Sequence, residues 1–181
     1  HLLPWPADPG VTSMQRIALE ATLETSFGLV RVTTTHLEYY SRMQRVAQVE
    51  RLRELHQEAV AQAFSQRPGD ISEGPFNFVP RAAASILTGD FNCPPESTER
   101  KRILAAMDDA TPPYRDAWEI AHPGEPHAPT VGIYDKAQWP KPPFTYDFIF
   151  VSEDLALRVK EMRVDATTNA SDHQPILLML A

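Results

Sequence analysis

The chain has 181 residues, of which 43% are hydrophobic, enough to form a sizeable core within one domain. Its formal net charge of -7 disfavours nonspecific binding to long stretches of nucleic acid, because that affinity comes largely from lysine and arginine side chains. The sequence holds one cysteine, Cys93, so an internal disulfide is excluded. We expect this thiol to be a small packed side chain.

An irregular, proline-rich lead-in over residues 1–12 precedes the first regular elements. Residues 16–25 and 29–36 have the pattern of two strands, and the short turn between them predicts a hairpin. Residues 41–64 repeat apolar side chains every three or four positions, which predicts a helix. The arginines of this helix, Arg53 among them, alternate with glutamates and are interpreted as surface ion pairs.

Loops and short apolar runs alternate in the rest of the chain. Residues 67–80 are rich in glycine and proline and predict a loop. Residues 82–87 predict a buried strand, and Ser97 is a suitable N-cap for a short helix. A proline-rich stretch follows over residues 123–143.

Three last strands are predicted at residues 144–151, 156–164 and 176–180. Strands interspersed with helices, with few βαβ units, favour a layered α/β sandwich over a doubly wound sheet. We interpret residues 1–181 as a single domain of this kind.

Four short motifs place polar side chains where apolar strands end. They are Thr34-Thr35-His36-Leu37, Gly89-Asp90-Phe91-Asn92, Tyr146-Asp147-Phe148 and Ser171-Asp172-His173. In an extended backbone Asp90 and Asn92 face the same way, which suits a carboxylate that activates water or holds a cation beside an amide. A carboxylate that accepts one ring N–H of His173 would raise the histidine pKa and favour the cation, and Asp147 is the candidate. Each motif alone also fits an ordinary turn or strand end, but the four together favour a functional interpretation.

These four motifs, in this order, resemble the endonuclease/exonuclease/phosphatase superfamily of metal-dependent phosphoester hydrolases. The resemblance runs from about Arg16 to the C-terminus and implies a layered αββα-type sandwich. Family members also carry a metal-contacting Asn and a metal-binding Glu upstream, and neither is recognisable before Thr34. We therefore expect the C-terminal part of such a domain, incomplete at its N-terminus.

The resemblance also implies roles for five side chains. Asp90 would activate or position the attacking water, and Asn92 would orient that water or the phosphate. Asp172 would help to bind Mg²⁺ or Mn²⁺, with further oxygen ligands from Asp90 and Asn92. His173, its ring held by Asp147, would contact the scissile phosphate.

Other histidines and one glutamate are additional candidates. His36 would be a second phosphate donor, and a histidine at this point resembles the secreted deoxyribonuclease and bacterial sphingomyelinase branches of the superfamily. Glu38 is a conceivable substitute metal ligand. His122 and His127 lie among prolines and could bind a metal, but their spacing matches no strong ligand pattern.

The sequence thus predicts a divalent-metal-dependent hydrolase of phosphoesters, in particular phosphodiesters, that uses metal-assisted attack by water. The alternative is a non-catalytic fragment or interaction module that has lost part of the metal site. The substrate stays open between nucleic acid, a phospholipid headgroup and a sugar phosphate, because variable loops recognise the leaving group.

No apolar run is long enough to predict a transmembrane segment, and the N-terminal residues lack the order of a signal peptide, so the cytoplasm is the expected location. If the first strands of the fold are absent, an exposed sheet edge follows, and we expect a homo-oligomer through that edge.

Overall fold

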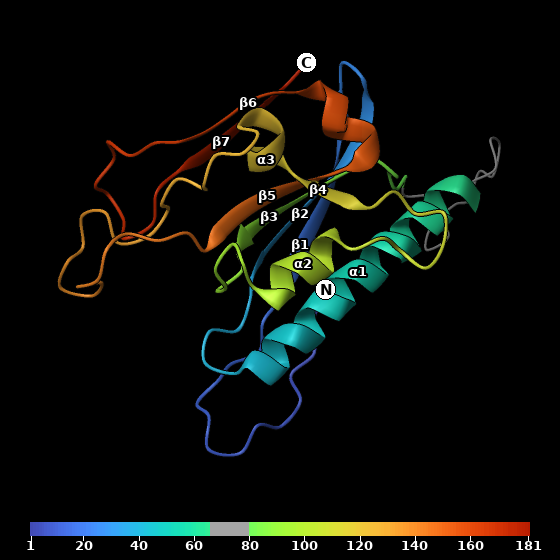
Figure 1. The fold of residues 1–181 in the computed structure, drawn as a ribbon. Coiled ribbons are helices and arrows are strands. Elements are labelled where there is room, and N and C mark those ends of the chain that lie inside the picture. The colour runs from blue at the N-terminus through green and yellow to red at the C-terminus, as the bar shows by residue number, and fades with distance from the viewer. Residues whose placement is uncertain (66–79) are drawn as a thin grey trace.

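Within the described residues, five strands form one mixed sheet in the order β1-β2-β3-β5-β4 (Figure 1). The computed structural model describes residues 1–65 and 80–181. The strands are β1 (Ala18–Thr25), β2 (Gly28–His36), β3 (Ser85–Asp90), β4 (Tyr114–Asp116) and β5 (Asp147–Ser152). β2 and β3 run parallel, whereas the other neighbouring pairs are antiparallel. The carboxyl ends of β2 and β3 therefore lie beside the start of β5.

The first two strands form the predicted hairpin. Their residues pair in register from Ala18 opposite Thr35 to Thr25 opposite Gly28. Gly28 has a φ of 109°, a backbone conformation that favours glycine, and it closes the turn. The hairpin delivers His36 to the end of β2, next to β3.

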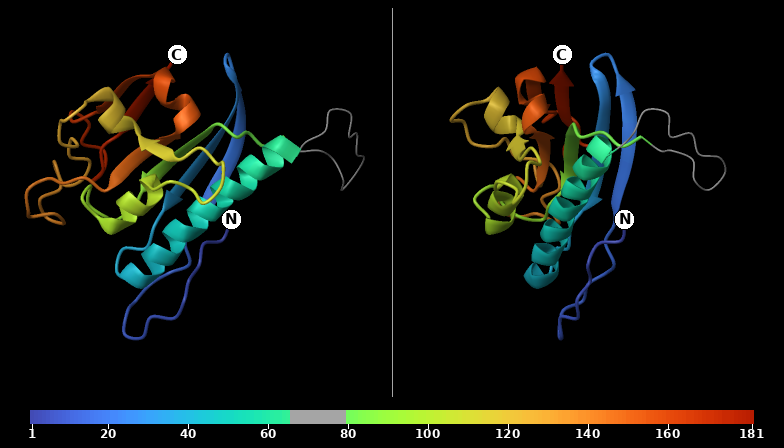
Figure 2. Two further views of the ribbon diagram at one scale, coloured as in Figure 1. Left: turned by 45° about the vertical axis from the view of Figure 1, so that its right-hand side comes forward. Right: turned by 90° about the vertical axis from the view of Figure 1, so that its right-hand side faces the viewer.

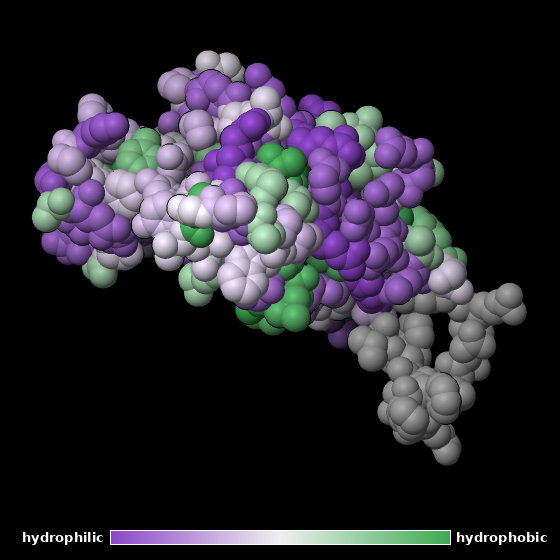
Figure 3. Space-filling model, turned by 90° about the horizontal axis from the view of Figure 1, so that it is seen from below, coloured by the Kyte–Doolittle hydropathy of each residue, from purple (hydrophilic) through white to green (hydrophobic). Residues whose placement is uncertain are grey.

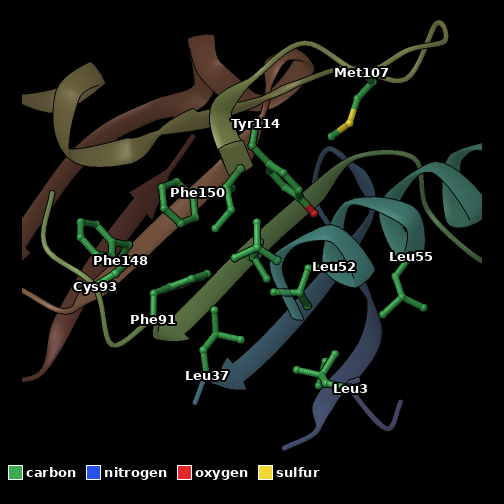
Figure 4. Packing of buried hydrophobic residues seen from close by; sticks show 14 residues of the cluster. Leu3, Leu37, Leu52, Leu55, Phe91, Cys93, Met107, Tyr114, Phe148 and Phe150 are labelled. Atoms are coloured by element: carbon green, nitrogen blue, oxygen red, sulfur yellow. The ribbon is translucent and has the colours of Figure 1, made fainter. Parts of the chain in front are cut away.

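Two helices, α1 (Arg42–Ser65) and α2 (Thr98–Leu104), cover one face of this sheet (Figure 2). The Ser97 side chain accepts the backbone N–H of Arg100 and caps α2, as predicted. Apolar side chains of both helices and of the sheet form the first core (Figure 4), which includes Leu37, Leu52, Leu55, Leu87, Phe91, Ile103, Phe148 and Phe150. Burying each large apolar side chain contributes roughly 1.5–3 kcal/mol to stability.

Cys93 belongs to the same core and is 1% exposed. Burial raises the pKa of its thiol, so the thiolate form is disfavoured. The prediction that Cys93 packs as a small side chain is therefore confirmed.

A smaller sheet packs on the opposite face of the larger one. In the described part of the chain it consists of β6 (Val159–Val164) and β7 (Ile176–Leu180), with α3 (Ala117–Ala121) beside it. The second core lies between the two sheets and includes Val30, Trp118, Ile149, Val151 and Met162. The layers thus follow as helices, large sheet and small sheet, which confirms the predicted layered α/β sandwich.

The strand predicted over residues 156–164 is partly wrong. It begins only at Val159, because the preceding residues form the 3-10 helix η2 (Glu153–Arg158). In η2, Leu155 is buried whereas Leu157 is 91% exposed. Leu155, Leu157 and Val159 occupy alternate positions of the sequence, as on one face of a strand, and this spacing misled the prediction.

Two short elements, β4 and α3, were not predicted. Each is too short to show a hydrophobic period. The side chain of Asp116 accepts the backbone N–H of Trp118 at 2.8 Å and caps α3. The strand expected over residues 144–151 is assigned as β5, which begins at Asp147.

Four polar side chains of α1 are buried, and Arg53 and His56 are two of them. The prediction of a surface ion pair is wrong for Arg53, which is 3% exposed and donates to the carbonyls of Arg102 and Ala106 at the end of α2. Its guanidinium satisfies carbonyls that a helix end leaves unpaired. The ring of His56 accepts from Arg31 at Nδ1 and donates from Nε2 to a backbone carbonyl. Burial lowers the pKa of His56 to about 4, which keeps the ring neutral.

Apolar side chains are exposed on β1, an edge strand of the large sheet, and on β7, a strand of the small sheet. On β1, Leu19 and Leu23 are 65% and 50% exposed, and on β7, Leu177 and Met179 are 41% and 57% exposed. Among the described residues β7 pairs with β6 alone, so its other backbone edge is open there. From below, the surface is largely hydrophilic with small hydrophobic patches between (Figure 3).

The loop predicted over residues 67–80 lies outside the described residues except for Pro80. No helix in the described part of the chain is long and apolar enough to cross a membrane.

Candidate active site

Three candidate side chains lie in a row across adjacent strand ends. His36 on β2 is the register partner of Asp90 on β3, and Asp90 is the partner of Asp147 on β5. Cross-strand partners point to the same face of a sheet, with Cβ atoms about 4.5–5.5 Å apart. Pairing of the strands alone therefore gathers two carboxylates and an imidazole at one edge of the sheet.

Gly89 permits the close approach of β3 to β2 at this point. Its φ is 143°, and a Cβ built on it would lie 1.9 Å from the carbonyl oxygen of Thr35. A larger residue would push the two strands apart next to Asp90. The glycine of the Gly-Asp-Phe-Asn motif is thus a steric requirement of the site.

Asp90 is held by the turn that follows it. Its Oδ1 accepts the backbone N–H of Asn92 at 2.8 Å, and its Oδ2 lies 3.4 Å from His36 Nε2. Burial raises the pKa of Asp90, and the nearby Asp147 carboxylate acts in the same direction. Asp90 is therefore more basic than a solvated aspartate.

Asn92 adopts the left-handed conformation, with a φ of 48°, which asparagine tolerates better than most residues. Its Nδ2 donates to the carbonyl of Leu37 at 2.8 Å. One of the two N–H groups of this amide is thereby used within the fold, and Asn92 also lines the cleft. Its Oδ1 can accept a hydrogen bond or bind a cation, and its second N–H remains available as a donor.

His173 and Asp147 form a dyad. The ring Nδ1 lies 2.9 Å from Asp147 Oδ2, and Thr130 Oγ1 donates to the same oxygen at 2.6 Å. The hydrogen bond that Nδ1 donates to the Asp147 carboxylate raises the pKa of His173. The opposite nitrogen, Nε2, lies 3.9 Å from Asp90 Oδ2 and 3.9 Å from Asp172 Oδ2. In its protonated form the imidazole thus presents the Nε2–H between two further carboxylates.

Asp172 is fixed by the loop between Val131 and Phe144. Its Oδ2 accepts the indole N–H of Trp139 at 3.1 Å, and its backbone carbonyl accepts the N–H of Gly132 at 3.0 Å. The hydrogen bond from Trp139 lowers the pKa of Asp172, which keeps it ionised. The sequence prediction included Asp172 but missed Trp139.

These side chains line one cleft of about 570 Å³. The other lining residues include Arg16, Tyr39, Tyr40, Gln138, Trp139 and Tyr146. Asp147 is not among the residues that line this cleft and acts on it through His173. The structure thus gathers His36, Asp90, Asn92, Asp172 and His173 around one space.

The donor atoms of the cleft fit a hard divalent cation. Atoms of Asp90, Asp147 and His173 lie within 4.8 Å of one another, an arrangement that can hold a metal ion. Both oxygens of Asp147 already face His173 or Thr130, however, so we assign Asp147 to the dyad. Oxygens of Asp90, Asn92 and Asp172 are the better candidates, because Mg²⁺ prefers oxygen ligands and completes its shell with water.

The remaining candidates lie outside the cleft. Glu38 is fully buried, and hydrogen bonds from Tyr40 N–H and Arg16 outweigh the effect of burial and lower its pKa. A substitute metal ligand at Glu38 is therefore excluded by its surroundings. His122 bonds to a backbone carbonyl and His127 to a buried aspartate, so these two histidines do not form a metal site.

The family model for the endonuclease/exonuclease/phosphatase family matches residues 26–173. The chain belongs to this family, as its four motifs predicted. A search of curated proteins found no similar sequence.

Solved structures share the fold at low sequence identity. An endonuclease/exonuclease/phosphatase from Bacteroides vulgatus is 20% identical, with a TM-score of 0.65, over 92% of this chain and 56% of that one. A mannosyl-6-phosphatase from Bacteroides thetaiotaomicron is 19% identical, with a TM-score of 0.59, over 93% of this chain and 58% of that one. A truncated TDP2 from Caenorhabditis elegans is 19% identical, with a TM-score of 0.62, over 100% of this chain and 64% of that one. The chain thus spans a little over half the length of these structures.

Proposed function

We propose that the protein is a divalent-metal-dependent phosphoester hydrolase, acting on phosphodiesters, and that residues 1–181 form the C-terminal part of its catalytic domain. Family membership supports a phosphoesterase-type reaction. The observation that carries the proposal is the His173–Asp147 dyad, whose free Nε2 lies between Asp90 and Asp172. A carboxylate that favours the imidazolium suits the binding of an anion such as phosphate.

Each side chain has a distinct task in this proposal. Asp90, whose pKa is raised by burial, accepts a proton from the attacking water. His173 donates from Nε2 to a phosphoryl oxygen, and His36 donates to a second one. Asn92 Oδ1 accepts a hydrogen bond from the water and orients it.

A divalent cation would be held by Asp172, Asp90 and Asn92. When bound, it supplies positive charge that offsets the charge developing on the phosphoryl oxygens. The cleft needs such a charge, because the guanidinium of Arg16, which also lines it, is paired with the buried carboxylate of Glu38 at 3.2 Å.

The test is Mg²⁺- or Mn²⁺-dependent hydrolysis of bis(4-nitrophenyl) phosphate. We expect Asp172→Ala to lower the rate by at least about a hundredfold, since general acid–base and metal contributions are each of that order. Asp108→Asn changes an exposed aspartate outside the cleft and serves as the matched control.

The same assay includes a form of the protein with any residues encoded upstream of His1. Activity that needs those residues supports a catalytic half that lacks partner ligands. Absence of hydrolysis in every form, with and without metal, rejects the enzyme and favours the alternative, an interaction module with the family fold. If hydrolysis is observed, nucleic acid, a phospholipid headgroup and a sugar phosphate are tested in turn as substrates.

We also propose that the isolated chain self-associates through the open edge of β7. Leu177 and Met179 are exposed along that strand, and an unpaired apolar edge invites strand pairing between copies. Light scattering over a concentration series should reveal oligomers that Leu177→Lys disperses. Leu157→Lys, on the exposed side of η2, should leave the oligomer intact. A monomer at high concentration contradicts the proposal.

A further inference from the structure

Aromatic rings form one wall of the cleft beside the dyad. Tyr39 and Tyr40 follow β2, Trp139 lies in the loop between Val131 and Phe144, and Tyr146 precedes β5. Four separate rings from three segments therefore line the same space as the candidate catalytic carboxylates.

The rings support one another. The ring centre of Tyr39 lies 6.5 Å from that of Trp139 and 6.5 Å from that of Tyr146. Phe144 packs edge-on against Trp139 at 5.2 Å and against Tyr146 at 4.6 Å. Phe144 does not line the cleft, so it backs the wall from behind. Such contacts hold aromatic side chains in fixed orientations.

Trp139 joins this wall to the reacting groups. Its indole N–H donates to Asp172 Oδ2, and Asp172 lies 3.9 Å from His173 Nε2. The loop that carries Trp139 requires a glycine at Gly132, whose φ is 72°. A Cβ atom at Gly132 would lie 2.8 Å from the Cβ atom of Trp139. A group on the wall would therefore be adjacent to a phosphate held at His173.

The wall is also neutral and partly open to solvent. Tyr39 and Tyr40 are 38% and 70% exposed. Arg16, whose side chain lines the cleft, has its Nε paired with Glu38, and the whole chain carries a net charge of -7. A second phosphate or a long polyanion finds no free positive charge on the wall, whereas a planar uncharged ring finds several π faces.

We propose that the substrate is a phosphoester whose leaving group carries a planar aromatic ring, which stacks on the wall of Tyr39, Trp139 and Tyr146. This inference rests on the proposed function, because it takes the Asp90–His173 cleft as the phosphate site. Tyr39 and Tyr146 are then specificity-determining residues, and Trp139 both binds the ring and positions Asp172.

Binding of two phosphonates that cannot be hydrolysed tests this assignment, measured by calorimetry in the presence of Mg²⁺. We expect phenylphosphonate to bind about tenfold or more tightly than methylphosphonate, since stacking of one ring on aromatic side chains is worth about that factor. Tyr39→Leu should reduce the ratio of the two affinities to less than about threefold, and this substitution leaves Asp172 unchanged. Phe64→Leu, at the end of α1 and outside the cleft, should leave the ratio unchanged.

The outcomes separate this inference from the proposed function. Equal binding of the two phosphonates, no binding of either, or a ratio that Tyr39→Leu leaves intact overturns the aromatic subsite. Equal hydrolysis of aryl and alkyl phosphodiesters keeps the hydrolase and rejects the subsite. Preferential binding of phenylphosphonate without any hydrolysis supports the subsite and rejects the hydrolase.

Discussion

Two histidine–aspartate pairs, His127–Asp116 and His173–Asp147, lie in contrasting surroundings. His127 Nε2 lies 3.0 Å from Asp116 Oδ2, and the two side chains are 9% and 0% exposed. His173 Nδ1 lies 2.9 Å from Asp147 Oδ2, and those side chains are 30% and 17% exposed. The distances are nearly equal, so distance alone does not distinguish a structural pair from a functional one.

The neighbours of each pair make the difference. Arg100 also bonds to Asp116 Oδ2, at 2.7 Å, and supplies a permanent counter-charge. His127 is packed against the rings of Trp118 and Phe148. At the cleft, the second nitrogen of the histidine faces two more carboxylates, and the nearest fixed donor to Asp172 is the neutral indole of Trp139. The negative charge of Asp116 is balanced by the adjacent Arg100. The carboxylates of the cleft lack such a permanent counter-charge.

The largest expected difference between the pairs is in activity. His173→Gln should lower the rate of phosphodiester hydrolysis by about 10²- to 10⁴-fold, because it removes a positioned proton donor. His127→Gln should leave the rate per folded molecule within about threefold. A comparable loss of activity in the two variants would contradict a functional role for His173 and a structural role for His127.

The second expected difference is in stability, and here the buried pair should show the larger effect. Asp116→Asn should cost roughly 3–5 kcal/mol of unfolding free energy, because it leaves Arg100 buried without its main partner. Asp147→Asn should cost only about 1–2 kcal/mol, since its site is partly solvated. Urea denaturation of both variants measures the difference, and equal costs would contradict it.

The third expected effect is on the binding of Mg²⁺, which would supply positive charge to the cleft. Mg²⁺ should raise the melting temperature of the chain, because it binds the folded cleft. Trp139→Phe removes the N–H that orients Asp172, so about tenfold more metal should be needed for the same shift. Trp5→Phe, which changes an exposed tryptophan outside the cleft, is the matched control. An identical metal dependence in all three proteins would exclude a positioning role for Trp139.

The smallest expected effect is a contrast in pH dependence. The pKa of His173 is raised in the folded state by Asp147, so its contribution to stability is complete below about pH 6.5 and is lost as pH rises through the folded pKa. Burial alone would raise the pKa of Asp116, but His127 and Arg100 outweigh it and lower that pKa. The contribution of Asp116 is therefore complete above about pH 3.8 and is lost at more acidic pH.

Melting temperatures between about pH 3 and 9 measure both contributions. The difference in melting temperature between the unmodified chain and His173→Gln should become smaller toward alkaline pH. The difference between the unmodified chain and Asp116→Asn should become smaller toward acid pH. Differences that stay constant across this range would show that neither pair is coupled to folding in this way.

The sequence predicted the strands that carry His36, Asp90 and Asp147 for a clear physical reason. β2 shows apolar alternation and β3 and β5 belong to short apolar runs, and a polar residue at the end of such a strand is readily seen as a candidate. His36, Asp90 and Asp147 could therefore be found in advance, and strand pairing brings them together.

Other features have no such signature. Trp139 lies in a proline-rich loop without periodicity, so its contact with Asp172 arises only in the folded chain. Arg53 was predicted to form a surface ion pair, but its buried hydrogen bonds to backbone carbonyls determine its surroundings. Elements as short as β4 and α3 are fixed by contacts across the fold more than by local pattern.

The buried position of Cys93 offers a way to time motions of the loop that carries Asp90 and Asn92. The thiol directly follows Asn92, is 1% exposed and is the one cysteine of the sequence. A thiol reagent can reach it only while this part of the fold opens, so the labelling rate equals the opening equilibrium multiplied by the rate for a free thiol. The labelling rate of Cys93 thus reports how often the loop that carries Asp90 and Asn92 opens, in the absence and presence of metal, without any introduced label.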